Sequence, residues 1–134
     1  MKIRCMLDTN TCIYIINRKY KQVVETFSNY KVGEVVISNI TACELAFGVK
    51  KSSSIDKNSS LLFEFFELIQ ILPFGQEAIW HYADILASLQ RKGSPIGAMD
   101  LLIAAHARSL NLPLVTNNTR EFERVEGLQL ENWI

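Results

Sequence analysis

The chain has 134 residues, the length of one domain with a sizeable core, so we expect a single folded domain over residues 1–134. Hydrophobic residues make up 49% of the chain and charged residues 21%, a balance that excludes a disordered or collagen-like protein. Fourteen basic and 14 acidic side chains give a net charge of zero, which argues against a generic nucleic-acid coat protein and leaves only local nucleic-acid contacts.

Short apolar runs alternate with helical patterns along the chain. In chain order we expect a strand at 3–7, a helix at 9–17, a strand at 35–37, helices at 41–50 and 61–69, a strand at 71–73, helices at 76–91 and 100–110, a strand at 114–116, a helix at 119–125 and a strand at 128–130. The polar run at 50–60 is expected to be a mobile loop. This alternation predicts an α/β fold with a parallel sheet of four to five strands, flanked by helices on both faces.

The cysteines and the N-terminus indicate a cytoplasmic protein. Cys5, Cys12 and Cys43 are odd in number, widely spaced and next to apolar residues, which favours buried reduced thiols over a disulfide framework. The segment M-K-I-R-C-M-L-D-T-N has no apolar stretch of signal-peptide length. No run approaches the roughly 20 apolar residues of a membrane span, so no membrane contact is expected.

Acidic and amide residues stand close to the ends of the expected strands. Asp8 ends the first strand, and Glu44 lies in the first turn of the helix after the second. Asp100 opens the helix D-L-L-I-A-A-H-A, and Asn118 and Glu121 lie just past the fourth strand. In a parallel sheet these positions share one edge, at the carboxyl ends of the strands.

These residues could simply be helix caps. Asp8 and Asp100 could be N-caps that accept a hydrogen bond from a first-turn N–H. The segment T-A-C-E at 41–44 matches the capping-box pattern, and N-T-R-E at 118–121 resembles it. Taken one at a time, the residues therefore have a structural explanation.

Taken together, the acidic residues favour a metal site. Asp8, Glu44, Asp100 and Glu121 would converge, and like charges about 4 Å apart repel by about 1 kcal/mol in water and more near a protein surface. An ionised cluster of this kind needs a cation, and carboxylate oxygens select Mg²⁺ or Mn²⁺ over zinc. Such an ion can activate water for phosphoryl chemistry. Because the chain has no GxxxxGK[ST] loop, we expect phosphodiester hydrolysis, and not nucleoside-triphosphate hydrolysis.

Four segments together resemble a known family. They read M-L-D-T-N, I-S-x-I-T-x-x-E, I-G-A-M-D-L-L-I-A-A-H-A and L-V-T-N-N-T-R-E-F. They are similar to the motifs of PIN-domain ribonucleases, and more closely to those of VapC-type toxins of type II toxin–antitoxin modules. The resemblance implies a PIN-like fold and an endoribonuclease dependent on Mg²⁺ or Mn²⁺, with tRNA as a common substrate. It also implies a homodimer and a small antitoxin that inserts a segment into the active-site groove.

The resemblance assigns roles to the acidic residues. Asp8, Glu44 and Asp100 match the three acidic metal-site positions of the family. The fourth position, which often holds aspartate, is Asn118 here, and an amide oxygen is a weaker ligand than a carboxylate. Glu121 would then supply the missing catalytic charge, and whether the site holds one ion or two stays open.

Other polar and basic residues are candidates for supporting roles. Asn10 and Thr116 match family positions that hydrogen-bond the carboxylates or the metal's waters, with local turn bonding as the alternative. The candidates for RNA contact are Lys50, Lys51, Arg91, Lys92, Arg120 and Arg124. Arg120 is favoured because it lies between Asn118 and Glu121, although solvated surface charge would also explain these residues.

Two other functions remain open. A metal-independent ribonuclease would use His81 or His106 for general acid–base catalysis, although packing in the core or an interface explains both histidines better. A non-catalytic module would bind RNA or a partner peptide and would not need the carboxylates. The first would keep cleaving in excess EDTA, and the second would stay toxic after Asp100→Asn.

Overall fold

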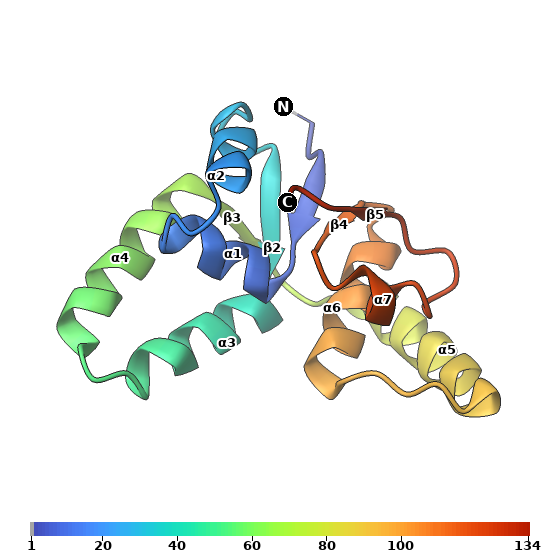
Figure 1. Cartoon of the computed structure of the whole chain (residues 1–134). Helices are drawn as coiled ribbons and strands as arrows, with labels where there is room; N and C mark the ends of the chain where they lie inside the picture. The colour runs from blue at the N-terminus through green and yellow to red at the C-terminus, as the bar shows by residue number, and fades with distance from the viewer. Residues whose placement is uncertain (1) are drawn as a thin grey trace.

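Five parallel strands form the centre of the protein in a computed structural model that describes residues 2–134 (Figure 1). They are β1 (Cys5–Leu7), β2 (Val35–Ser38), β3 (Gln70–Leu72), β4 (Leu114–Val115) and β5 (Leu130–Glu131). Their order in the sheet is β3-β2-β1-β4-β5, and every neighbouring pair runs parallel. Every residue of β1, β2 and β4 is buried, which accounts for their apolar sequence, with Ser38 at the end of β2 as the one polar residue. The predicted fold class and strand number are confirmed.

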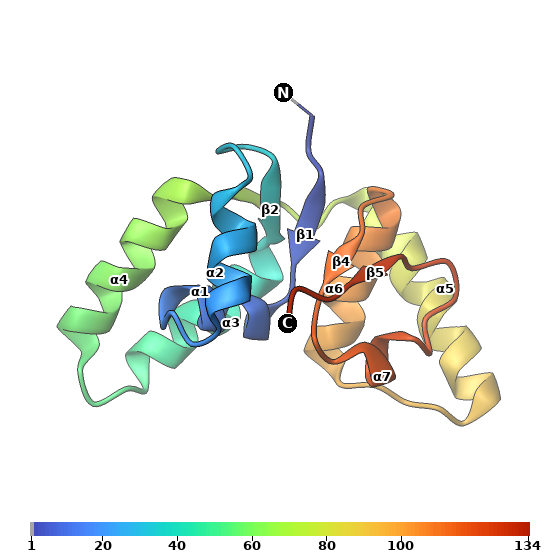
Figure 2. The ribbon, with the colours of Figure 1, turned by 45° about the horizontal axis from the view of Figure 1, so that its top comes forward.

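Helices cover both faces of this sheet (Figures 1 and 2). Those within residues 2–134 are α1 (Thr9–Ile16), α2 (Lys21–Ser28), α3 (Asn39–Lys50), α4 (Ile55–Leu68), α5 (Gln76–Lys92), α6 (Ala98–Ser109) and α7 (Thr119–Phe122). Side chains of α1, α2 and α4 pack with Cys5 and Leu7 into one core cluster. Side chains of α5, α6 and α7 pack with Met6 into a second cluster, because successive strand residues point to opposite faces.

The sequence does not predict helix α2. Its segment K-Q-V-V-E-T-F-S contains β-branched residues, which have weaker helix propensity than straight-chain ones. Val23 is buried, and Phe27, one turn later, packs against the same core. Tertiary packing of these two side chains therefore outweighs the local preference.

The predicted loop at residues 50–60 is wrong over its second half, because α4 begins at Ile55. The hydroxyl of Ser60 donates a hydrogen bond to the carbonyl of Asp56 inside the helix. Leu62 and Phe65 are buried and anchor the helix, which extends from them back over polar residues. The predicted end of α5 at Gly93 is correct, and this glycine has the left-handed φ of 64° that suits such a position.

Two of the three cysteines are buried as predicted. Burial raises the pKa of the Cys5 thiol to about 12, so this group stays protonated, and Cys12 is also buried. Cys43 is exposed, so the prediction of burial is wrong there. It lies on α3 between the buried residues Thr41 and Leu45, which face the core one turn apart.

Candidate active site

The carboxyl ends of β1, β2 and β4 lead into the segments that carry Asp8, Glu44 and Glu121, whereas Asp100 lies in α6, which precedes β4. Asp8 directly follows β1, and its backbone N–H donates to the carbonyl of Val115 in β4, 3.0 Å away. Because β1 lies between β2 and β4, these strand ends lie side by side. The edge is flanked by α3 on one side and by α6 and α7 on the other (Figure 1). The topology thus brings four distant segments to one place.

Asp8 is both a helix cap and a buried carboxylate. It is the N-cap of α1, and its Oδ1 accepts a hydrogen bond from the backbone N–H of Thr11 at 2.8 Å. Only 4% of Asp8 is exposed. Burial raises its pKa, hydrogen bonds from Thr116 and Thr11 oppose the rise, and the charge of Glu44 adds to it. The capping prediction is confirmed, and it does not compete with a role at the site.

Glu44 is held by a residue that follows Asp8. The hydroxyl of Thr9 donates to Oε1 of Glu44 at 2.5 Å. Helix α3 begins earlier than the sequence predicts, so Glu44 lies in its second turn. Ser38 is the N-cap of α3, and its Oγ accepts from the N–H of Ile40 at 3.1 Å. The predicted capping box at 41–44 is therefore wrong.

Asp100 and Glu121 lie against the same glycine. Gly97 is the N-cap of α6, so the prediction that Asp100 caps this helix is wrong, and Asp100 lies in the first turn. The N–H of Gly97 donates to Oε1 of Glu121 at 2.9 Å. A Cβ at Gly97 would lie 3.5 Å from Oδ2 of Asp100 and 3.8 Å from Oε1 of Glu121. The side-chain amide of Asn118 donates to the other oxygen of Glu121 at 2.5 Å, which replaces the predicted capping-box bond.

The four carboxyl groups share one electrostatic environment. The pKa of Asp100 rises from its ordinary value of 3.8 to about 7. Burial is the largest cause, followed by the hydrogen bond with Glu121 and its charge, and then by the charges of Glu44 and Asp8. A carboxyl group whose pKa is raised in part by three neighbouring negative charges indicates a strongly negative site.

The donor atoms of this edge fit a hard cation. Carboxylate and amide oxygens from Asp8, Glu44, Asp100, Glu121 and Asn118 are the available ligands, and hard oxygen donors suit Mg²⁺ or Mn²⁺. Within residues 2–134, no three His, Cys, Asp or Glu side chains close around an ion by themselves. Mg²⁺ usually keeps several waters and binds only one or two carboxylates, so a loosely gathered set is compatible with it.

A PIN domain family model matches residues 5–128. The chain belongs to the PIN domain family. The "tRNA(fMet)-specific endonuclease VapC" of Shigella flexneri is 44% identical to it over 131 residues, 98% of each chain. The crystal structure of DNA-bound VapBC from Salmonella typhimurium matches with a TM-score of 0.93 and 41% identity, over 98% of this chain and 99% of that one. VapBC2 from Rickettsia felis, bound to a promoter DNA fragment, matches with a TM-score of 0.90 and 38% identity, over 98% and 100%. The resemblance to VapC-type proteins is confirmed.

Two small polar residues of this PIN domain differ in their contacts. Thr116 is fully buried and hydrogen-bonds Asp8, while its Oγ accepts from the N–H of Asn118 at 2.9 Å. Asn10 is exposed, and its side chain forms no hydrogen bond with residues 2–134. Thr9, next to it in D-T-N, makes the carboxylate contact instead. Thr9 was not among the residues predicted for the site, although a hydroxyl residue directly after an aspartate at a strand end is a signal that could have identified it.

The basic residues of the PIN domain lie on its surface, and some of them contact other residues of the chain while others do not. The guanidinium of Arg124 donates to the carbonyl of Pro95 at 2.7 Å, and Lys51 lies 5.2 Å from the ring centroid of Phe47. Arg120 forms no ion pair within residues 2–134. The exposed candidates for RNA contact are Lys50, Lys51, Arg91, Lys92, Arg120 and Arg124.

Both histidines of the PIN domain are engaged in packing, as predicted. His106 is fully buried in α6 and bonds Ser38. His81 is half-buried in α5, where its Nδ1 accepts from Nε of Arg108 at 2.8 Å. Neither ring contacts the carboxylates, which does not favour a histidine-based mechanism.

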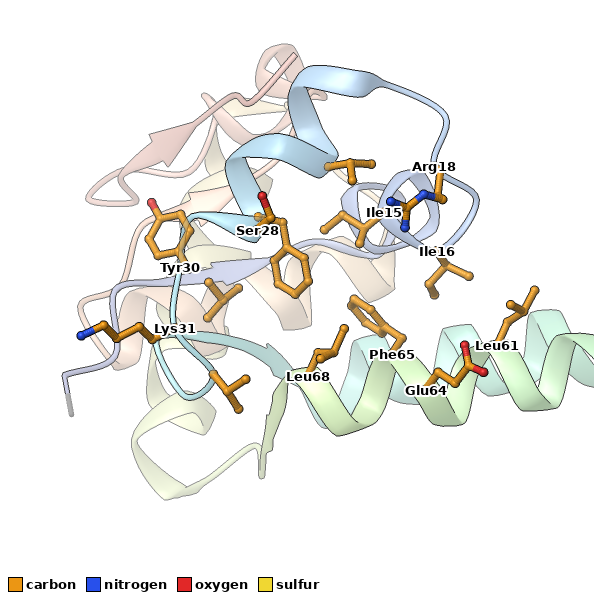
Figure 3. A pocket seen from close by; sticks show the side chains of 14 residues that line it. Ile15, Ile16, Arg18, Ser28, Tyr30, Lys31, Leu61, Glu64, Phe65 and Leu68 are labelled. Carbon is orange, nitrogen blue, oxygen red and sulfur yellow. The ribbon is translucent and has the colours of Figure 1, made fainter.

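Two cavities of the PIN domain lie beside α1, and one of them borders the acidic edge. A cavity of about 600 Å³ lies between α1, α2 and α4, where Ile15, Leu61, Phe65 and Leu68 contribute to its lining (Figure 3). None of the four acidic residues borders it. A smaller hollow of about 230 Å³ has Glu44 in its wall.

Asp8→Asn is expected to raise the melting temperature of the metal-free PIN domain. Burial and the nearby Glu44 both disfavour the charged form of Asp8, and a neutral amide removes that cost while its oxygen still caps α1. Thermal unfolding in EDTA measures the effect. Asp56→Asn, at an exposed carboxylate in the first turn of α4, is the control and should give no rise. A lower melting temperature for metal-free Asp8→Asn would contradict the repulsion argument.

Proposed function

We propose that this chain is the toxin of a type II toxin–antitoxin module and an endoribonuclease that depends on Mg²⁺ or Mn²⁺, with tRNA as its substrate class. The observation that carries the proposal is the environment of Asp100, where burial, the hydrogen bond with Glu121 and the charges of Glu121, Glu44 and Asp8 raise its pKa to about 7. The relatives support it, because the Shigella flexneri protein is named as a tRNA(fMet)-specific endonuclease. The Salmonella typhimurium relative was solved as a VapBC complex.

Asp8, Glu44 and Asp100 would hold the ion, with Glu121 or Asn118 contributing. When bound, the ion lowers the pKa of a water ligand and neutralises charge on a phosphate oxygen. Residues of the chain prepare the site by fixing their own carboxylates. Attack by water, and not by the ribose 2′-hydroxyl, leaves a 5′-phosphate and a 3′-hydroxyl.

Hydrogen bonds orient each carboxylate before substrate arrives. Thr116 and the backbone of Thr11 hold Asp8, and Thr9 holds Glu44. The N–H of Gly97 and the amide of Asn118 occupy the two oxygens of Glu121. Because the pKa of Asp100 is about 7, this carboxyl group carries a proton for part of the time near neutral pH, and it would have to lose that proton to hold a cation.

The proposal includes a small antitoxin as partner, a homodimer and activity in the cytoplasm. The VapBC complexes among the structural relatives support the antitoxin. Large apolar side chains are available for protein contacts, since Phe47, Phe63 and Trp80 are 65%, 66% and 75% exposed. None of the helices within residues 2–134 has the length and apolar character needed to cross a bilayer.

Incubating purified protein with bulk tRNA tests the proposal. Cleavage should stop in excess EDTA and return with Mn²⁺, and the new ends should carry a 5′-phosphate and a 3′-hydroxyl. Cleavage that persists in EDTA would favour the histidine mechanism. Products with 2′,3′-cyclic phosphate would reject attack by water.

Glu121→Gln is expected to lower cleavage about 10- to 100-fold, the range found when residues that support a metal site are removed. The amide keeps an acceptor for the N–H of Gly97 but removes the charge that stands in for aspartate at Asn118. Cleavage rates measured across a Mn²⁺ titration check this. Glu123→Gln, at an exposed carboxylate two residues later, is the matched control. Equal rates for the two variants would show that Glu121 takes no part.

A further inference from the structure

A buried imidazole links three elements behind the acidic edge. His106 of α6 is 1% exposed, and its Nδ1 lies 2.7 Å from Oγ of Ser38, the last residue of β2. The same Oγ accepts from the N–H of Ile40 and caps α3. The ring also donates to the backbone carbonyl of Pro73, just past β3. The side chain thus joins α6 to the ends of two neighbouring strands.

The direction of each bond follows from the chemistry of the partners. Burial lowers the pKa of His106, so the ring is neutral and has one N–H and one acceptor nitrogen. A carbonyl can only accept, so the ring proton lies on the nitrogen that faces Pro73. Because Nδ1 faces Ser38, it is the acceptor, and the serine hydroxyl donates to it. Neither His106 nor Ser38 has an unpaired buried side-chain atom in the described part of the chain.

The loop after β3 also contacts His106 and the start of α3. The N–H of Phe74 donates to Oδ1 of Asn39, the first residue of α3, at 3.2 Å. The ring of Phe74 packs edge-on against the imidazole, with centroids 5.5 Å apart and planes at 71°. The imidazole is therefore fixed by packing as well as by hydrogen bonds. Buried and engaged at both nitrogens, His106 cannot reach a phosphate, which excludes it as an acid or base for RNA.

The two helices joined in this way carry two of the acidic residues. Glu44 lies further along α3 from Ser38, and Asp100 lies earlier in α6 than His106. Asp8 is placed directly by β1, whereas the separation of Glu44 and Asp100 depends on how α3 and α6 are held together. We propose that His106 is a positioning residue, whose bond with Ser38 sets the distance between Glu44 and Asp100. This inference rests on the proposed function, in which both carboxylates hold Mg²⁺ or Mn²⁺.

Two substitutions separate the two bonds of the imidazole. His106→Asn places an amide oxygen near the position of Nδ1, so it keeps an acceptor for Ser38 and loses the bond to Pro73. His106→Gln reaches Pro73 with its amide and loses the acceptor for Ser38. Both variants disturb the core. His81→Gln is the matched control, because it removes an Nδ1 acceptor with a similar 2.8 Å bond, to Arg108, on another helix.

Mn²⁺ binding without RNA is the decisive measurement, made by the EPR signal of free Mn²⁺ on purified protein. We expect His106→Gln to bind Mn²⁺ about 10-fold or more weakly, the lower end of the effect of removing a residue that supports a metal site. His106→Asn and His81→Gln should bind like the wild type, although their melting temperatures in EDTA are lower. At saturating Mn²⁺ the KM for tRNA should be unchanged in His106→Gln, because no RNA contact is altered.

Each alternative result has a defined meaning. Wild-type affinity in His106→Gln would overturn the positioning role and leave the proposed function intact. Equal losses in His106→Asn and His106→Gln that follow their melting temperatures would also overturn it, since that is the result of general destabilisation. A wild-type protein that binds no Mn²⁺ would overturn the proposed function itself. Should His106→Gln fail to fold, Ser38→Thr and Ser38→Ala make the same comparison, and only the alanine variant should lose Mn²⁺ affinity.

Discussion

Asp100→Asn is expected to abolish growth arrest when the chain is expressed without an antitoxin, and to reduce RNA cleavage roughly 10²–10³-fold, the loss typical of removing one electrostatic group from an active site. Asp100 is the residue whose pKa responds to Glu121, Glu44 and Asp8 together, so its charge is central to the site. An asparagine side chain has nearly the same shape but cannot supply this charge. Cleavage of tRNA in vitro and colony formation after induction measure the two effects.

Asp84→Asn is the control for this substitution. Asp84 is an exposed carboxylate on α5, where it forms an ion pair with Arg108 at 2.7 Å. Its removal should leave cleavage and growth arrest unchanged, since it lies outside the acidic edge. If folded Asp100→Asn still arrests growth, the chain acts as a non-catalytic binding module and the metal-dependent mechanism is wrong.

The metal-free protein is expected to become less stable as the pH rises from 4 to 8. The pKa of Asp100 is about 7 in the folded state and near 3.8 in the unfolded state. Between these values the folded state binds more protons than the unfolded state, so the free energy of unfolding decreases with rising pH. This contribution is complete below pH 4 and is lost as the pH passes 7. Thermal unfolding in EDTA should show a higher melting temperature at pH 5 than at pH 8.

The comparison with Asp100→Asn isolates this effect. Burial lowers the pKa of His106, which gives the opposite pH dependence in both proteins and so cancels in their difference. Excess Mn²⁺ should raise the wild-type melting temperature most at pH 8, because the ion supplies the missing positive charge. If the melting temperature changed with pH by the same amount in the wild type and in Asp100→Asn, Asp100 would not titrate as described.

Patterns that depend on neighbouring residues were readable from the sequence. The buried runs of β1, β2 and β4 are apolar except for Ser38 at the end of β2, because helices cover both faces of the sheet, and this predicts a parallel α/β arrangement. Asp8 could be recognised as a cap because its partner, Thr11, is three positions away. From a parallel sheet it then followed that the acidic residues lie at one common edge.

Features that depend on distant residues could not be predicted. Ser38 meets His106 across 68 positions, and the partner of Thr9, Glu44, is 35 positions away, although the place of Thr9 directly after Asp8 was a local signal for a role at the site. Capping was misjudged for a local reason, since Ser38 accepts from the N–H of Ile40 and caps α3 before the segment 41–44, which only matches the capping-box pattern. Helix α2 forms because Val23 and Phe27, one turn apart, pack against the same core, which outweighs the local preference of its β-branched residues. In each case a contact made by the folded chain decides between local alternatives.

The sheet order has a consequence for how the acidic edge is built during synthesis. Strands β4 and β5 join the sheet beside β1 last, and α6 and α7 bring Asp100 and Glu121 from the final third of the chain. A polypeptide still emerging from the ribosome holds Asp8 and Glu44 but lacks their two counterparts. Under the proposed function, a chain that ends before Asp100 has no complete acidic edge and should not cleave RNA, so the site is completed only when the final third of the chain has been made.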